Sequence, residues 1–399
     1  MIKLAVVSPN PQTLDALCDA LSGIAALDGI LQLRQYPELD QIDQLAEASA
    51  GSILLLDFTD FSLALKIAKA FDRSAHEIKP IAVFSPAPSR DHLMELMQVG
   101  IREIIVPPFG RTEICGAVMR MAEKAGRVSE AEMLGEIHAF LPAKPGAGAT
   151  TVCTSVAAAV ARLTNRRTLL LDFDIKLGVT SFLLKLNGTH SVADALKDSG
   201  RLDDDLWEKL VGQRDGLEIL GSAPSQVAHP FAPPDYGAVL TYAQQVYSVI
   251  CVDLPGSMEE YEIDTLRRAA RIYLVCTGDM TSLHMAQRKM ALLNELGVLT
   301  PVSVILNFVG KRGSLSVPDI EKILQTSVRF TLPGDEATVP ESVKQGAPIS
   351  GRSPLAARLQ EIAEKIAAAT DKSIKPRKVK KFVEFFSVSR ARTQFGGSQ

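Results

Sequence analysis

Short apolar runs alternate with amphipathic stretches along the first 125 residues. Between the apolar runs, hydrophobic residues recur at helical spacing, for example over Pro11–Leu21 and Arg90–Val99. Strands that alternate with helices are typical of a parallel sheet covered by helices on both faces. We therefore predict an α/β domain over residues 1–125. Its predicted strands are Lys3–Val7, Ile30–Arg34, Ile53–Asp57, Pro80–Phe84 and Glu103–Val106.

A second series of strands and helices follows, and it predicts another doubly wound parallel sheet over residues 136–371. Its strands are expected at Ile137–Leu141, at Thr168–Asp172, before Asp253, at Arg271–Cys276 and at Val302–Leu306, and its last helix at 352–370. The polar residues 126–135 have no strand pattern and are expected to form a linker. Residues 372–399 are expected to form a separate tail.

Composition places the chain among ordinary globular proteins. At 399 residues, 46% apolar and 22% charged, it is expected to form two or three domains. No run of about 18 apolar residues predicts a membrane-spanning helix, and the strand-like first eight residues do not suggest a signal peptide. The five cysteines form no C-x-x-C pair, so we expect free thiols, no metal site and a cytoplasmic location.

Charge is distributed unevenly. The last 28 residues carry a net charge of +7, and the first 371 therefore carry −10. The tail sets basic residues beside aromatic ones, as in Lys380-Lys381-Phe382, which suits an anionic membrane surface or an acidic partner. A solubilising tail without structure is the alternative. The acidic body argues against specific binding to nucleic acid.

A glycine-rich loop lies between the strand that ends at Leu141 and an alanine-rich helix from about Thr150 to Leu163. Glycines there let backbone N–H groups face one anion at a helix N-terminus. A standard phosphate loop reads G-x-x-x-x-G-K-[ST]. Here the hydroxyl is present, but alanine takes the place of the lysine. The predicted nucleotide-binding residues of the loop are Pro145, Gly146, Ala147, Gly148, Ala149, Thr150 and Thr151. A βα turn without a ligand is the alternative.

Two later strands end in carboxylates. The first ends at Asp172 with Asp174 two residues on, a spacing that points both side chains to one side if the strand continues. The second ends at Asp253, and Gly256 follows it. Carboxylates at the carboxyl ends of strands beside a phosphate loop suit Mg²⁺ binding and the positioning of a water. An acidic turn at a strand end is the alternative.

The glycine loop and the two strands that end in carboxylates resemble the motifs of the deviant Walker A ATPases of the MinD/ParA family. The resemblance implies that Lys144 is the signature lysine that reaches a partner's nucleotide, and that Asp174 supports hydrolysis. It also implies that Thr150, Asp172 and Asp253 hold Mg²⁺, partly through water, and that Gly256 senses the γ-phosphate of ATP. Asn307, at a strand end, would read adenine, and Pro333 would lie in the loop that covers the base. A turn asparagine is the alternative for Asn307.

The first domain resembles the response-regulator receiver fold. Asp57 ends the third strand, where that family places its phospho-acceptor, and Ser85 follows the fourth. The acidic pair expected after the first strand is absent, since Ser8-Pro9-Asn10 stands there, and Pro107 replaces the final lysine. We therefore expect an atypical receiver used for protein contacts. Phosphorylation at Asp57 is the alternative.

An atypical receiver followed by a MinD/ParA-like domain is similar to the TadZ/CpaE proteins of Flp (tight adherence) pilus assembly. That resemblance implies a homodimeric, ATP-bound platform that places the pilus secretion ATPase and other Tad components at a cell pole, beside the inner membrane. Because Ala149 replaces the lysine, we expect ATP binding with weak or absent hydrolysis. The alternatives are an active partitioning or positioning ATPase and a scaffold without nucleotide.

Overall fold

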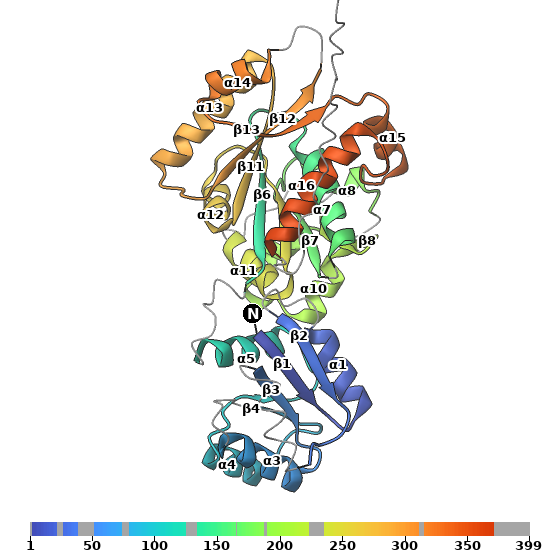
Figure 1. Ribbon diagram of the computed structural model, residues 1–399, viewed down its shortest axis with the longest axis vertical. Helices are drawn as coiled ribbons and strands as arrows, with labels where there is room; N and C mark the ends of the chain where they lie inside the picture. Colours follow the sequence, from blue (N-terminus) through green and yellow to red (C-terminus); the bar gives the residue numbers. More distant parts are fainter. Residues whose placement is uncertain are drawn as a thin grey trace, which may run out of the picture.

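The computed structural model describes residues 2–21, 27–38, 52–73, 80–124, 134–164, 166–186, 190–222, 235–310 and 315–370. Most of the predicted linker at 126–135 lies outside the described residues, and so does the whole basic tail. Figure 1 shows two α/β units in separate parts of the molecule, each with its own sheet.

The N-terminal unit contains the five predicted strands and their helices. The strands are all parallel, in the order β2-β1-β3-β4-β5, which is the doubly wound order of flavodoxin-like sheets. Its elements are β1 (Ile2–Val7), α1 (Pro11–Leu21), β2 (Leu27–Leu33), β3 (Ser52–Asp57), α3 (Phe61–Arg73), β4 (Pro80–Val83), α4 (Arg90–Gln98), β5 (Ile104–Ile105) and α5 (Arg111–Lys124).

Both faces of this first sheet are buried. One face packs against α1 and α5 through residues such as Leu14, Leu17 and Val118. The other face packs against α3 and α4 through residues such as Ile67 and Leu96. A strand that is buried on both sides reads as a continuous apolar run, which is why its pattern was visible in the sequence.

The C-terminal unit is built on an eight-stranded sheet in the order β13-β12-β11-β6-β10-β7-β9-β8. Every pair is parallel except β8–β9, an antiparallel edge that the sequence did not predict. The elements of the first half are β6 (Glu136–Pro142), α7 (Ala149–Leu163), β7 (Thr168–Asp172), α8 (Thr180–Leu183), α9 (Val192–Lys197), η1 (Ser199–Arg201), α10 (Asp204–Leu210), β8 (Gly212–Arg214) and β9 (Leu217–Leu220). Those of the second half are α11 (Tyr236–Val246), β10 (Val249–Asp253), α12 (Glu260–Arg268), β11 (Arg271–Thr277), α13 (Met280–Glu295), β12 (Val302–Val309), α14 (Val317–Leu324), β13 (Val328–Pro333), α15 (Thr338–Gln345) and α16 (Pro354–Thr370).

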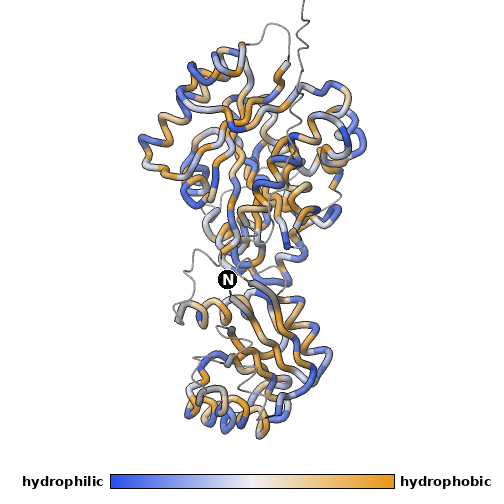
Figure 2. Tube along the Cα trace, viewed as in Figure 1, coloured by the Kyte–Doolittle hydropathy of each residue, from blue (hydrophilic) through white to orange (hydrophobic). Residues whose placement is uncertain are grey.

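Helices cover both faces of the large sheet as well. Helices α7 and α16 lie side by side on one face, where small residues such as Ala157 and Ala363 are fully buried. Helices α11, α12 and α13 pack on the other face, where Trp207 is also buried. Figure 2 shows apolar residues concentrated along the strands of both units. The predicted α/β architecture with two parallel sheets is therefore confirmed.

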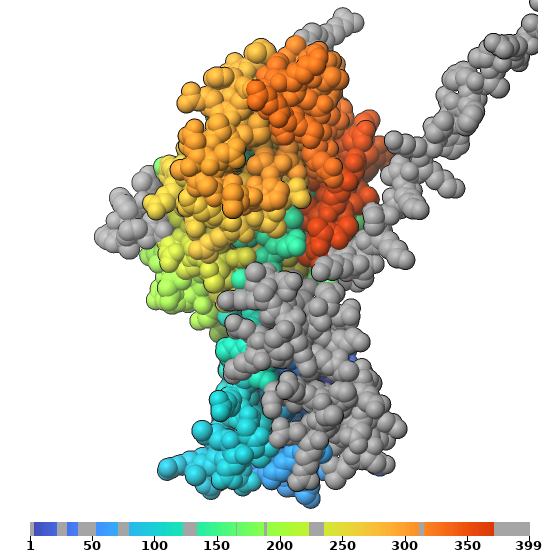
Figure 3. Space-filling view, turned by 60° about the vertical axis from the view of Figure 1, so that its left-hand side comes forward, coloured from blue at the N-terminus to red at the C-terminus, as the bar shows by residue number. Residues whose placement is uncertain are grey.

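The two units meet where α5 contacts α10 and α11. The side chain of Asp204, in the first turn of α10, accepts hydrogen bonds from the backbone N–H of Thr112 at 3.2 Å and from its hydroxyl at 2.7 Å. Helix α11 leads into the amino end of β10, whereas the glycine loop follows the carboxyl end of β6. The contact between the units therefore lies at the opposite end of the sheet from the loop. Figure 3 shows the two parts from a second side.

Among the described helices, none is both long enough and apolar enough to cross a membrane.

Candidate functional site

The glycine loop connects β6 to α7 at the centre of the large sheet. Gly146 and Gly148 have φ values of +79° and +90°, which residues with a Cβ rarely adopt. Gly148 is the N-cap of α7, and no side chain caps the N–H groups of the first turn. Uncapped N–H groups at a helix N-terminus favour an anionic ligand.

Asn307 supports this loop from the end of the neighbouring strands. Its Nδ2 donates to the carbonyl oxygen of Ala147 at 2.9 Å, and its Oδ1 accepts from the N–H of Phe308 at 2.9 Å. A Cβ on Gly148 would lie 2.5 Å from Nδ2, so this close approach also requires glycine. In this structure the amide that the resemblance assigned to adenine is therefore buried and holds the loop, and its contact with a base stays a prediction.

Asp172 and Asp253 lie directly opposite each other on β7 and β10. Both carboxylates are buried. Asp172 accepts hydrogen bonds from the N–H groups of Asp174 at 3.0 Å and Thr180 at 3.3 Å. The Oδ1 atom of Asp253 has no hydrogen-bond partner. A buried carboxylate oxygen without a partner is costly, so this position favours a cation or a proton.

The ionisation of the pair reflects this environment. Burial raises the pKa of Asp253 well above its ordinary value, the negative charge of Asp172 raises it further, and a hydrogen bond from Thr150 opposes both effects. Burial also raises the pKa of Asp172, against its hydrogen bonds with Thr180 and Asp174. Two neighbouring carboxylates of this kind are a common sign of a functional site.

Asp174 does not continue the strand. Because β7 ends at Asp172, the chain turns, and the N–H of Asp174 bonds back to Asp172 while Leu177 donates to the Asp174 carboxylate at 2.9 Å. The condition for both side chains to point to one side is therefore not met. Asp172 is buried beside Asp253, and Asp174 faces the cavity.

A cavity of about 510 Å³ lies over the loop and brings most of the predicted residues together. The predicted residues that line it are Pro145, Gly146, Ala147, Gly148, Ala149, Thr150, Asp174 and Asp253. Ile175, Lys176, Glu259 and Tyr261 also line it and were missed, because they are ordinary surface and turn residues in the sequence. The predicted residues that do not line it are Lys144, Thr151, Asp172, Asn307 and Pro333.

Lys144 makes an ion pair with Asp279, with 3.0 Å between Nζ and Oδ1. Asp279 is the N-cap of α13, where its carboxylate accepts from the N–H of Ser282. Asp279 therefore caps this helix in preference to the hydroxyls of Thr281 and Ser282, which lie inside its first turn. Hydrogen bonds from Thr277 and Ser282 and the charge of Lys144 lower the pKa of Asp279 to about 2.

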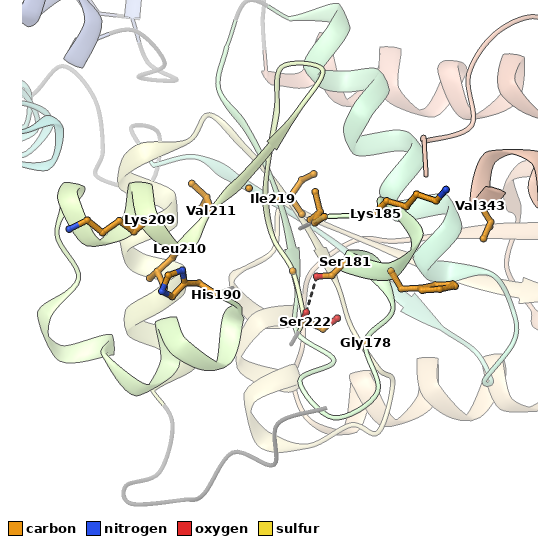
Figure 4. Close-up of a pocket in the computed structure, with 14 residues that line it drawn as sticks. Gly178, Ser181, Lys185, His190, Lys209, Leu210, Val211, Ile219, Ser222 and Val343 are labelled. Atoms are coloured by element: carbon orange, nitrogen blue, oxygen red, sulfur yellow. Dashed lines mark hydrogen bonds between the residues drawn. The ribbon is translucent and has the colours of Figure 1, made fainter. Parts of the chain in front are cut away.

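A second cavity of about 500 Å³ lies beside α8 and contains none of the predicted residues. Figure 4 shows the charged ends of Lys185 and Lys209 pointing away from each other, on opposite sides of it. Lys185 donates to the carbonyl oxygen of Lys344 at 2.6 Å. Because these charges do not converge, they do not form an anion site in this cavity.

In the N-terminal unit, the carboxylate of Asp57 is fully buried. It accepts from the hydroxyl of Ser8 at 2.5 Å, and from the N–H and the hydroxyl of Thr59 at 2.8 Å and 2.7 Å. Ser8 thus stands where the resemblance would place an acidic metal ligand, and it engages the carboxylate directly.

Known proteins resemble the C-terminal unit. The chain is 25% identical over 223 residues to a putative septum site-determining protein MinD of Emiliania huxleyi. The aligned residues make up 54% of this chain and 80% of that protein. It is 24% identical over 245 residues to the septum site-determining protein MinD of Thermotoga maritima, and the aligned residues make up 58% of this chain and 88% of that protein.

Solved structures share the fold. A ParA family ATPase from Chlorobium tepidum superposes with a TM-score of 0.54 at 21% identity, over 58% of this chain and 98% of that one. MinD from Pyrococcus horikoshii, complexed with Mg-ADP, superposes with a TM-score of 0.51 at 19% identity, over 60% and 100%. The family described as the CobQ/CobB/MinD/ParA nucleotide binding domain matches residues 139–349, which is more than half of the chain. The chain therefore belongs to the CobQ/CobB/MinD/ParA nucleotide-binding family.

Proposed function

We propose that this protein binds ATP with Mg²⁺ in the cavity over the glycine loop and hydrolyses it slowly or not at all. The observation that carries the proposal is the unpartnered Oδ1 atom of Asp253, buried beside Asp172 at the edge of an uncapped helix N-terminus. A triphosphate and its cation would satisfy both the uncapped N–H groups and the buried carboxylate.

The residues present fit Mg²⁺ that arrives with phosphate. Asp253, Asp172 and the hydroxyl of Thr150 supply the oxygen ligands that this ion prefers, directly or through water. Among the described residues, no group of three or more His, Cys, Asp or Glu side chains could hold a metal by itself. The cation would therefore need phosphate oxygens, and when bound it would neutralise charge on the β- and γ-phosphates.

The composition of the loop supports slow turnover. Ala149 lines the cavity where the lysine of a standard phosphate loop would stand, so no ammonium group from this position meets the terminal phosphates. Lys144 pairs with Asp279 within the same chain. We propose that the dimer forms when Lys144 leaves Asp279 for the nucleotide of a second copy, so that ATP acts as an assembly signal.

We propose the finer role from the combination of the two units. It is a dimeric platform of Flp/Tad pilus assembly that acts in the cytoplasm at a cell pole and localises the pilus secretion ATPase or another component of that machinery. An N-terminal unit that serves for protein contacts fits this role, and the burial of Asp57 supports a receiver-like unit that does not depend on phosphorylation. The MinD relatives are named for septum placement, which is also a spatial task.

The test is the affinity for ATP in the presence of Mg²⁺, measured together with the molar mass by light scattering. We expect binding, a shift to a dimer, and loss of the dimer in Lys144→Ala. Lys197→Ala, which removes an exposed lysine of α9 away from the cavity, is the matched control.

Two outcomes would replace the proposal. Rapid turnover that a partner stimulates and that Asp174→Ala abolishes would indicate an active partitioning or positioning ATPase. No binding at millimolar ATP, with an unchanged mass, would leave a scaffold without nucleotide.

A further inference from the structure

Two buried charges hold the loop that follows β10. The N–H of Gly256 donates to Oε2 of Glu262 at 2.8 Å, and the hydroxyl of Ser257 donates to Oε1 of the same carboxylate. On the other side, Nζ of Lys289 donates to the carbonyl oxygen of Gly256 at 2.6 Å and to that of Pro142 at 2.8 Å. Both hydrogen-bonding groups of Gly256 are therefore occupied by charged side chains.

Both charged side chains lie on helix faces that are buried from water, where an ion is normally unfavourable. Glu262 lies in the first turn of α12, as the third residue of a capping box with Glu259, and it is 0% exposed. Lys289 lies on the buried face of α13 and is 7% exposed. Burial lowers the pKa of Lys289, and the charge of Glu262 opposes that shift. A buried charge is retained only when other groups compensate it, and here the compensating groups are the backbone of Gly256 and the opposite charge.

The contact with Lys289 requires a glycine at position 256. It has a φ of +80°, and a Cβ at this position would lie 2.5 Å from Nζ of Lys289 and 3.0 Å from Cγ of Pro142. The glycine therefore lets the ammonium group reach the backbone, in addition to allowing the turn. Since Pro142 ends β6 just before the glycine loop, Lys289 fastens the loop after β10 directly to the base of the phosphate-binding region.

We propose that Glu262 and Lys289 form a charged clamp that fixes Gly256 and makes the site discriminate weakly between nucleoside triphosphates and diphosphates. This inference rests on the proposed nucleotide site. A third phosphate that takes the N–H of Gly256 must displace the Glu262 carboxylate and approach its negative charge, which is fully buried. The clamp thus removes the backbone group to which the resemblance assigns sensing of the γ-phosphate.

The experiment compares the affinities for ADP and for a non-hydrolysable ATP analogue, both with Mg²⁺, on the full chain. At protein concentrations too low for the dimer, we expect the two dissociation constants of the unmodified protein to agree within about threefold, because a loop that is held equally in both states gains nothing from the third phosphate. In Glu262→Gln, which keeps the shape and removes the charge, we expect the ratio to shift by about tenfold in favour of the triphosphate. Glu260→Gln, an exposed glutamate in the same helical turn, should leave the ratio unchanged.

Hydrogen exchange of segment 254–258 provides a measurement that does not depend on nucleotide. We expect slow exchange in the unmodified protein and exchange at least about tenfold faster in Lys289→Met, which keeps the apolar stem and removes the donor. A preference of more than about tenfold for the triphosphate in the unmodified protein, or an unchanged ratio in Glu262→Gln, would overturn the discrimination that we propose.

If neither nucleotide binds, the proposed function fails, and exchange decides on the clamp by itself. Unchanged exchange in both Lys289→Met and Glu262→Gln would show that no such clamp operates.

Discussion

The carboxylate of Asp204 binds both the backbone N–H and the hydroxyl of Thr112, a residue 92 positions earlier in the chain. Thr112 lies in the first turn of α5, where N–H groups have no partner within the helix. The same carboxylate accepts from the hydroxyl of Tyr242 at 2.6 Å. One side chain of the C-terminal unit therefore caps a helix of the N-terminal unit and ties it to α11.

We expect Asp204→Ala to weaken this junction. Loss of the cap should lower the free energy of unfolding by about 1 kcal/mol and accelerate hydrogen exchange in the first turn of α5. Asp205→Ala removes an exposed carboxylate from the same helical turn and is the control. Equal exchange in the two variants would mean that the contact does not stabilise α5.

The buried carboxylate pair predicts a pH dependence of stability in the absence of nucleotide. The pKa of Asp253 is higher in the folded protein than in the unfolded chain, mainly because of burial. The folded state then binds the proton more tightly, so the contribution of this group to stability is present at low pH. That contribution falls as pH rises above about 4, and it is lost once pH passes the raised pKa.

Asp253→Asn should remove this loss. We expect the variant to be more stable than the unmodified protein at pH 7 by about 1 to 3 kcal/mol, with a flatter dependence on pH. Denaturant unfolding at several pH values measures both quantities. Glu208→Gln, at an exposed position of α10, should not change the slope. A variant of Asp253 that is less stable at neutral pH would contradict the prediction.

Restoring the lysine of the phosphate loop should increase both binding and turnover. In Ala149→Lys, an ammonium group would enter the cavity from the loop and neutralise charge on the terminal phosphates. We expect affinity for ATP to rise by about tenfold, the equivalent of one charge-assisted hydrogen bond. Ala149→Met has similar length without the charge and should give no gain. Titration calorimetry and phosphate release measure the two effects.

The ion pair between Lys144 and Asp279 predicts competition between the monomer and the proposed dimer. Asp279→Asn keeps a capping side chain for α13 but releases Lys144 from the ion pair. Because the pair is partly exposed, we expect the ATP-dependent dimer to strengthen only by about two- to fivefold. Asp264→Asn, which breaks a surface pair with Arg268, is the control. Sedimentation at several protein concentrations distinguishes these results from an unchanged dimer.

We expect Asp57 to resist phosphorylation. Its carboxylate is fully buried, and hydrogen bonds from Ser8 and Thr59 occupy both oxygens. Incubation with acetyl phosphate and Mg²⁺ should therefore add no phosphoryl mass in intact-protein mass spectrometry. A phosphoryl adduct that disappears in Asp57→Asn would show that the site opens in solution.

The sequence by itself determined the position of most strands and of the glycine loop, whereas it did not predict the antiparallel edge of β8 and β9. Strands such as β1, β6 and β10 are buried on both faces, so their apolar runs are continuous and their ends can be read within about two residues. The glycine loop and Asp253 follow two such runs directly. Because the carboxyl ends of parallel strands share one edge of a sheet, local patterns were enough to predict that the loop and Asp253 lie close together.

Only the tertiary structure decided which groups hold that site. Glu262 and Lys289 look like ordinary charges of surface helices in the sequence, and Asn307 was predicted to read adenine, with a turn residue as the alternative, so nothing pointed to its contact with the glycine loop. Their roles depend on contacts with Gly256, Pro142 and Ala147, the last of them 160 positions from Asn307. Likewise, no local pattern marks Asp204 as a cap for a helix in another unit. Periodicity reports which face of an element is buried, whereas a contact between distant residues depends on how the elements pack.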